Sequence, residues 1–178
     1  TDIESMPSMK LQERIALRNS GHIAPDDIYQ YIASGGYAGL NKALFGMKPD
    51  DVITEMKDSG LSGRGGAGFP TGLKWVFMVR SPGPPKYILG NCEEGDPGAY
   101  NDKGILEGDP CTLLEGMTLA GYATGATNGI VFIRHGHNGP INRTMKAIEQ
   151  AYETGLLGSN ILDSEFSFDI EVSLTGES

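Results

Sequence analysis

The chain has 178 residues, with 14 Lys and Arg against 23 Asp and Glu, and carries a formal net charge of -9 at pH 7. This acidic balance argues against a nucleic-acid partner, because duplex binding depends on clustered basic residues that displace counterions. Its apolar runs stay well below the ~18 residues of a membrane span, and its 2 cysteines are too few for a disulfide framework or a four-cysteine iron-sulfur cluster within this sequence. We therefore expect a soluble, cytoplasmic α/β protein.

The first 60 residues predict a small helical unit after a tail or linker over residues 1–14. The run Ala24-Pro25-Asp26-Asp27 predicts a short helix with Pro25 in its first position and acids in its first turn. A second helix is expected over 37–45. A third is expected to begin at Lys48-Pro49 and to stop at Ser59-Gly60.

A glycine-rich loop follows this helical unit. Four glycines fall within six residues, which lets the backbone adopt positive φ and approach a ligand closely: Gly63, Gly65, Gly66 and Gly68. Arg64 and Lys74 add positive charge, and Pro70 is expected in the first turn of a helix whose N-terminal amides favour an anion. This composition predicts a site for a phosphate-bearing cofactor.

The spacing of the loop fits neither of two common phosphate motifs. The Gly-Lys-Ser/Thr triplet of the Walker pattern does not occur in the sequence. Residues 63–68 match GxGxxG, but the dinucleotide fingerprint needs a preceding strand, and residues 52–60 indicate the end of a helix.

The residues from 61 to 178 predict a Rossmann-like, three-layer α/β domain with a mainly parallel sheet. Strands are expected at 86–90, 129–134 and 166–173, and helices with apolar residues at three-and-four spacing at 110–125 and 141–154. Two crossovers of this length predict parallel strands joined by right-handed connections. The sequence ends directly after the third strand, from which we expect a domain truncated at its C-terminus.

Three acids in four residues follow the first expected strand: Glu93, Glu94 and Asp96. This loop lies at the carboxyl end of a strand, where open parallel sheets bind ligands. Its carboxylates could pair with cations (Arg64, Lys74 or Lys103), bind hydroxyl groups of a cofactor, hold a metal, or form a solvated turn ending in Pro-Gly. Metal ranks low because the EF-hand order is missing. His135 and His137 are interpreted as turn residues, and no metal site is expected.

Two segments, residues 60–75 (Gly-Leu-Ser-Gly-Arg-Gly-Gly-Ala-Gly-Phe-Pro-Thr-Gly-Leu-Lys-Trp) and 91–98 (Asn-Cys-Glu-Glu-Gly-Asp-Pro-Gly), together resemble the family of NADH-binding flavoprotein subunits. That family includes the NADH-oxidising, FMN-carrying subunit of respiratory complex I and the diaphorase subunits of NAD-linked or bifurcating hydrogenases and formate dehydrogenases. Residues 102–103, 105–107, 114–117 and 166–169 match as well. The resemblance covers nearly the whole chain from about Ile15.

The resemblance implies a role for each motif. The FMN phosphate is expected on the glycine loop, at Gly63, Arg64, Gly65, Gly66, Ala67, Gly68 and Lys74. Asn91, Glu93 and Glu94 match positions that bind the flavin, and Asp96, with Glu94 beside it, matches a carboxylate near the nicotinamide. Phe69 and Phe77 match aromatics that stack on the adenine, although the residues around Phe77 taken alone favour core packing.

The implied activity is NADH dehydrogenase chemistry, in which hydride passes from NADH to FMN and electrons continue to iron-sulfur centres. No acid or base catalyst is expected. The family's Gly-Glu-Glu-Thr motif, its β-grasp-like domain and its four-cysteine [4Fe-4S] bundle have no counterpart in these residues, so we expect this segment alone to bind FMN weakly and to be inactive.

The resemblance also implies partner subunits in a redox complex, one with iron-sulfur clusters, and a location peripheral to the inner face of a membrane complex. A non-catalytic nucleotide-binding or scaffolding module and a phosphate-transfer enzyme remain alternatives. The parent complex, the choice of NADH or NADPH, the acceptor and the oligomeric state stay open.

Overall fold

A computed structural model describes residues 13–175, so most of the expected tail over 1–14 lies outside the described part. In chain order its elements are α1 (Ile28–Ala33), α2 (Ala38–Gly46), α3 (Pro49–Asp58), α4 (Thr71–Arg80), β1 (Tyr87–Cys92), α5 (Asp102–Gly108), α6 (Pro110–Thr124), β2 (Asn128–Arg134), α7 (Asn138–Glu153), the 3-10 turn η2 (Ile161–Asp163) and β3 (Asp169–Thr175). The α/β class and the helical N-terminal part are as expected.

The expected start of the first helix is wrong by about three residues. Asp27, not Ala24, is the N-cap of α1, because its carboxylate accepts the backbone N–H groups of Tyr29 and Gln30. Pro25 therefore precedes the helix. The third helix begins at Pro49 as expected, with the Asp51 carboxylate accepting the N–H of Lys48 at 2.9 Å.

The sheet has the order β1-β2-β3, and both neighbouring pairs are parallel. Helices α5 and α6 connect β1 to β2, and α7 connects β2 to β3, which confirms the expected crossovers. The third strand begins at Asp169, later than expected, because Phe168 pairs with Gly158 in an isolated antiparallel bridge. Helix α5 was not expected from the sequence.

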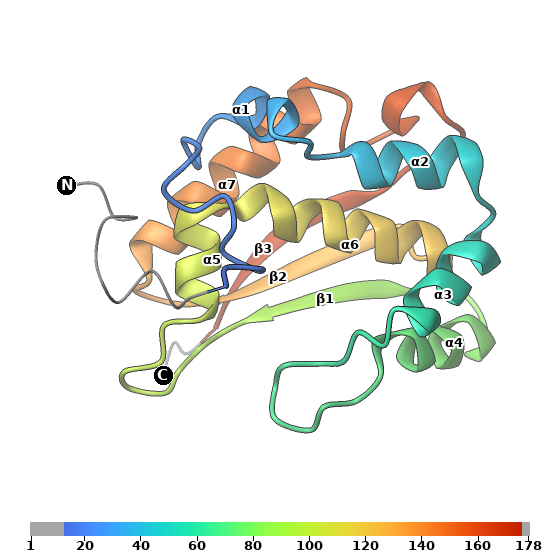
Figure 1. The fold of residues 1–178 in the computed structure, drawn as a ribbon, viewed down its shortest axis with the longest axis horizontal. Helices are drawn as coiled ribbons and strands as arrows, with labels where there is room; N and C mark the ends of the chain where they lie inside the picture. The colour runs from blue at the N-terminus through green and yellow to red at the C-terminus, as the bar shows by residue number, and fades with distance from the viewer. Residues whose placement is uncertain (1–12, 176–178) are drawn as a thin grey trace.

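One face of the sheet packs against α6 and α7. Side chains alternate along a strand, so the rows Ile88/Gly129/Ile170, Gly90/Val131/Val172 and Cys92/Ile133/Leu174 share this face. A Cβ at Gly90 would lie 3.0 Å from the Met117 sulfur, so this glycine lets α6 approach β1 closely. Figure 1 shows α6 and α7 between the sheet and the N-terminal helices α1 and α2, which gives three layers.

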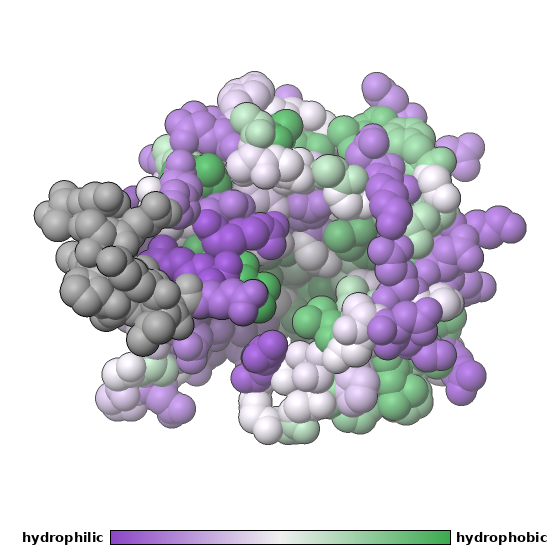
Figure 2. All heavy atoms as spheres, in the orientation of Figure 1, coloured by the Kyte–Doolittle hydropathy of each residue, from purple (hydrophilic) through white to green (hydrophobic). Residues whose placement is uncertain are grey.

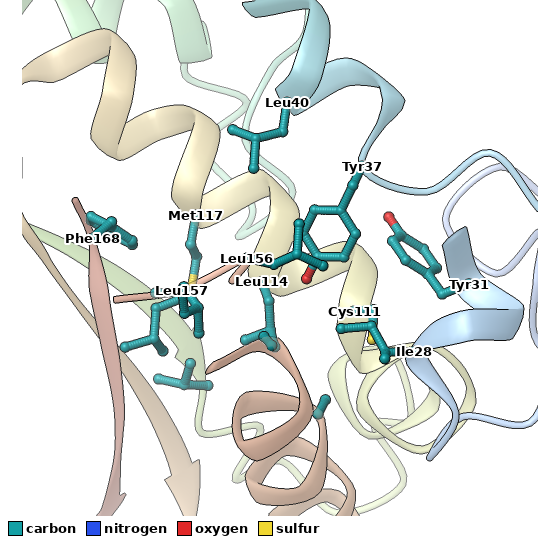
Figure 3. Close-up of a cluster of buried hydrophobic side chains, with 14 of the residues drawn as sticks. Ile28, Tyr31, Tyr37, Leu40, Cys111, Leu114, Met117, Leu156, Leu157 and Phe168 are labelled. Atoms are coloured by element: carbon teal, nitrogen blue, oxygen red, sulfur yellow. The ribbon is translucent and has the colours of Figure 1, made fainter. Parts of the chain in front are cut away.

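The N-terminal helices and the α/β part share a core, seen in Figure 3. Buried side chains of the first helices meet α6 and the segment after α7 in one cluster: Ile28, Tyr31, Tyr37, Leu40, Cys111, Leu114, Met117, Leu156, Leu157 and Phe168. Glu115 of α6 fixes the contact, because it accepts the Tyr31 hydroxyl at 2.6 Å and the N–H groups of Tyr37 at 2.8 Å and Leu40 at 3.2 Å. Glu115 thereby caps the start of α2 from another helix.

The opposite face of the sheet is open in the described part of the chain. Tyr87 is 48% exposed and Leu89 is 59% exposed, while Ile130 and Phe132 are half-buried. Parallel sheets normally have both faces covered, so this apolar face is available to further structure or to a ligand. The side chains of Asn91 and Arg134 alternate onto the same face near its carboxyl end.

Candidate functional site

The glycine loop is closed at its base and open along its length. The Gly63 N–H donates to the Phe69 carbonyl at 2.8 Å, and the Thr71 N–H donates to the Leu61 carbonyl at 2.9 Å. Between these bonds every residue from Gly63 to Pro70 is exposed. Gly66 at φ 104° and Gly68 at φ 62° adopt the left-handed region that favours glycine. The loop therefore presents backbone groups to a ligand from a fixed base.

Helix α4 begins directly after this loop and is held tightly behind it. Pro70 is the N-cap residue, one position before the expected first turn. Trp75 is buried in a second apolar cluster with residues of α3 and α6. A Cβ at Gly72 would lie 2.7 Å from the Lys57 backbone nitrogen, so only glycine allows this approach of α4 to α3. Close packing thus fixes the N-terminus of α4 at the loop.

Two basic side chains of the loop region have no partner among the residues that the structure describes. Arg64 and Lys74 are exposed, and within residues 13–175 neither side chain forms a hydrogen bond or ion pair. Of the alternative partners considered for the acidic loop, these two cations do not pair with it in the described part of the chain. Both remain free to bind an anion, next to the dipole of a ten-residue helix.

Phe69 and Phe77 lie together beside the loop. Their ring centroids are 6.2 Å apart with an interplanar angle of 46°. Phe69 is 39% exposed and Phe77 is 50% exposed, so core packing does not account for Phe77. Figure 2 shows hydrophobic side chains over α4 at the lower right, next to the pale glycine loop. The pair forms an exposed aromatic surface suited to a planar ring.

Glu94 in the loop after β1 is committed to the protein itself. Its carboxylate accepts the backbone N–H groups of Asn101, Asp102 and Lys103, and the Lys103 ammonium lies 3.5 Å away. The Glu94 side chain is only 5% exposed, and its φ is 37°. Burial raises the pKa of Glu94, but the N–H donors and the charge of Lys103 outweigh it, so the pKa lies below its ordinary value.

This capping explains why α5 exists. Residues 102–108 contain two glycines and are too short to form a stable helix alone. Glu94 satisfies the orphan N–H groups at the start of this helix from outside it. Lys103 was one of three cations considered for the acids, and the pair it forms with Glu94 confirms it as a partner.

Glu93 bridges the ends of two strands. Its Oε1 accepts a hydrogen bond from Arg134 Nη1 at 2.6 Å, and its Oε2 accepts the Gly95 N–H at 3.1 Å. The Glu93 N–H donates to Asn91 Oδ1 at 3.3 Å. Arg134 was not among the site residues expected from the sequence. Its position at the end of the parallel neighbour of β1 was the signal that could have identified it.

Asp96 is the acid of this loop that stays exposed without a side-chain partner in the described chain. Its carbonyl accepts the Ala99 N–H at 3.1 Å across Pro97-Gly98, with Gly98 at φ 81°. The expected Pro-Gly β-turn is therefore present. The turn projects the Asp96 carboxylate into solvent.

Cys92 ends β1 beneath the acidic loop, and its thiol is free and buried. Burial, with smaller effects of Asp102 and Glu94, raises the pKa of its thiol to about 12. His135 and Gly136 lie in the turn after β2, where the His137 N–H donates to the Arg134 carbonyl at 3.2 Å. Among residues 13–175 no three Cys, His, Asp or Glu side chains gather into a metal-binding group.

Figure 1 places the glycine loop and the loop after β1 along the lower edge of the molecule in that view. Such a fold, with a glycine-rich loop before a helix and polar residues at the ends of parallel strands, defines an α/β domain of the cofactor-binding class. More particularly, the chain belongs to the Nuo51 FMN-binding domain family, whose model matches residues 56–177.

Two relatives show the extent of this similarity. The chain is 51% identical over 163 residues to the NADP-reducing hydrogenase subunit HndC of Solidesulfovibrio fructosivorans, covering 92% of this chain and 33% of the relative. It is 43% identical to an NADH-quinone oxidoreductase subunit of Rhizobium meliloti (strain 1021), covering 90% of this chain and 38% of the relative. The chain thus spans about a third of the length of these curated relatives.

Solved structures agree with the family. The NAD+-reducing [NiFe]-hydrogenase in the H2-reduced state is similar over 74% of this chain and 22% of that chain, with a TM-score of 0.63 and 31% identity. Its air-oxidized state gives a TM-score of 0.60 at the same identity, over 71% of this chain and 20% of that chain. The shared part is therefore a domain within a much longer polypeptide.

Proposed function

We propose that the whole protein is a flavoprotein NADH dehydrogenase, an NADH:acceptor oxidoreductase in which this domain binds FMN and borders the NADH site. The observation that carries the proposal is the glycine loop of this FMN-binding domain family member. The loop combines exposed backbone with two cations, Arg64 and Lys74, that have no partner within residues 13–175. Positive φ at Gly66 and Gly68 keeps the loop backbone open, so the residues present fit a phosphate-bearing cofactor.

The phosphate of FMN would lie against the loop from Gly63 to Gly68, including Ala67 and Gly65. Arg64 and Lys74 would neutralise its charge, since neither is engaged elsewhere in the described structure. The adenine of NADH would stack on Phe69 and Phe77, whose exposed rings already lie together. This aromatic pair lies beside the phosphate loop, as a compact dinucleotide site requires.

The polar loop after β1 would contact the flavin and nicotinamide. Asn91 and Glu93 end on the open face of the sheet and can bind hydroxyl and ring groups of the flavin. Asp96 would be the carboxylate nearest the nicotinamide, because its side chain is exposed and unpaired in the described chain. Glu94 would support this loop from beneath through α5, because its carboxylate is already occupied.

When bound, FMN supplies the hydride acceptor, and this chain's residues hold and orient the two cofactors. No general acid or base is required. We further propose that the protein is one subunit of a multi-subunit redox complex, passes electrons to an iron-sulfur partner, and is peripheral to the cytoplasmic face of a membrane complex. Relatives bear the names of NADH-quinone oxidoreductase and hydrogenase subunits. No helix among the described residues is long and apolar enough to cross a membrane.

Titration of the flavin-depleted whole protein with FMN tests the proposal. Flavin fluorescence should be quenched on binding. Lys74→Gln should raise the dissociation constant for FMN at least about tenfold, as expected for a lost charge-assisted contact. Lys146→Gln serves as the matched control, because Lys146 pairs with Glu149 on the surface of α7. Absence of FMN binding would reject the proposal. Binding without reduction by NADH would favour the non-catalytic scaffolding module.

A further inference from the structure

Arg134 occupies a position that links the ends of two parallel strands. It is the last residue of β2, and its guanidinium reaches Glu93, the first residue after β1, with Nη1 2.6 Å from Oε1. The two side chains are 41% and 36% exposed, so the pair lies at the surface of the carboxyl edge without being free in solvent. This is the edge at which open parallel sheets bind their ligands.

The local packing depends on this pair. The second oxygen of Glu93 accepts the Gly95 N–H at 3.1 Å, so the carboxylate is held between Arg134 and the loop backbone. A Cβ at Gly95 would clash with Arg134 Nη1, and it would lie 3.0 Å from Glu93 Oε2. Glycine at 95 therefore leaves the space that the guanidinium occupies.

An ordinary surface ion pair contributes little to stability, typically about 0–1 kcal/mol. The Arg134–Glu93 pair matters instead because of the side chains that it orients. Glu93 and Asn91 are the polar side chains that project onto the open face at the proposed flavin site, and the Glu93 N–H is itself bonded to Asn91. By holding Glu93, the Arg134 guanidinium therefore fixes the direction of both Glu93 and Asn91. Residues behind a binding site orient the side chains that contact a cofactor in the same way.

We infer that Arg134 is a positioning residue, which holds the Glu93 carboxylate and the loop from Asn91 to Gly95 in the geometry that binds the flavin. The inference rests on the proposed function for its ligand, FMN. The structural part of the inference is that Arg134 holds the Glu93 carboxylate against the Gly95 N–H. This part is independent of any cofactor. Arg134 acts through Glu93 rather than by touching the reacting atoms.

A double-mutant cycle in the whole protein tests this inference. Arg134→Gln should raise the FMN dissociation constant about tenfold, in the range found when outer-shell partners are lost. Arg134→Lys should restore part of the affinity. In a Glu93→Gln background, Arg134→Gln should add less than about twofold, because the two residues act as one unit. Additive losses, or an unchanged dissociation constant in Arg134→Gln, would overturn the inference.

Hydrogen exchange of the Gly95 amide supplies a readout that needs no flavin. In the flavin-free protein, Arg134→Gln should speed this exchange several-fold, as expected when local opening becomes easier. Arg143→Gln is the matched control, because Arg143 pairs with Asp26 at 3.7 Å, away from this loop. An unchanged exchange rate of the Gly95 amide in Arg134→Gln would overturn the inference that Arg134 holds this loop in place. Failure of the wild type to bind FMN would instead reject the proposed function, and the exchange experiment would still decide the role of Arg134.

Discussion

The aromatic rings of Phe69 and Phe77 lie 6.2 Å apart, one at the end of the glycine loop and one two turns into α4. Both are substantially exposed, although the residues around Phe77 in sequence are apolar. Exposed aromatic pairs of this kind are uncommon in a solvated surface without a role in binding. The pair marks where a planar base can stack.

Phe77→Ala should therefore weaken NADH binding with little effect on folding. A stacking contact is worth about 0.5–1.5 kcal/mol beyond area burial, so we expect the KM for NADH to rise roughly 3–10-fold while FMN is retained. Steady-state kinetics of the whole protein with ferricyanide as acceptor measure this change. Phe45→Ala is the control, since Phe45 is 60% exposed on α2. Equal KM values for the Phe77 variant and the wild type would argue against stacking.

Backbone conformation in the glycine loop gives a second prediction. Gly68→Ala places a Cβ at φ 62°, which costs about 1–2 kcal/mol, and at Gly66 with φ 104° we expect a cost at least as large. Each should lower the Tm of this domain, followed within the whole protein, by roughly 2–8 °C. Gly65→Ala is the matched control for stability, because its φ is not positive and its Cβ would meet no atom within 4 Å. A Gly65 variant as destabilised as the other two would contradict the observed loop geometry.

The glycine loop and the crossovers could be predicted because their signals are local. Clustered glycines and apolar three-and-four spacing act within a few residues of one another, so Gly63 to Gly68 and helix α6 follow from the sequence. Helix α5 could not be predicted, since it depends on Glu94, which lies eight residues before Asp102, the first residue of the helix. Arg134 was missed for the same reason: its partner Glu93 is 41 residues away and becomes a neighbour only when β1 and β2 pair.

Glu94→Gln should destabilise the loop and helix α5 in a pH-dependent way. The cap that Glu94 forms is worth about 1–2 kcal/mol, and the amide accepts these N–H groups less strongly than the carboxylate does. Because the folded pKa of Glu94 is lowered, its contribution is present above the unfolded value near 4.5 and is lost as pH falls through the folded pKa.

The difference in unfolding free energy between wild type and Glu94→Gln should therefore be full at pH 7 and shrink below about pH 4.5. Urea denaturation of the whole protein across this range measures it. Glu55→Gln is the control, because Glu55 and Lys42 form an exposed pair with side chains 58% and 62% exposed. A difference independent of pH would show that the charge of Glu94 is not what stabilises the loop.

The two cysteines should resist modification in the folded state. Burial raises the pKa of the Cys92 and Cys111 thiols to about 12 from an ordinary value of 9.0. Thiol-reactive dye should label both rapidly in urea and slowly in native buffer at pH 8. Because the pKa values of both thiols are raised in the folded state, their contribution to the free energy of unfolding is full below about pH 9. It declines as the pH rises towards 12. Rapid native labelling of Cys92 would contradict its burial beneath the acidic loop.

Anaerobic titration of the whole, FMN-loaded protein with NADH tests the central claim most directly. The flavin absorbance should bleach as NADH is added, because each hydride transfer delivers two electrons to one flavin. The same titration in Asp96→Asn should show weakened or slower reduction with FMN still bound. Flavin that stays oxidised in the wild type under excess NADH would contradict the proposal that this domain places nicotinamide against FMN.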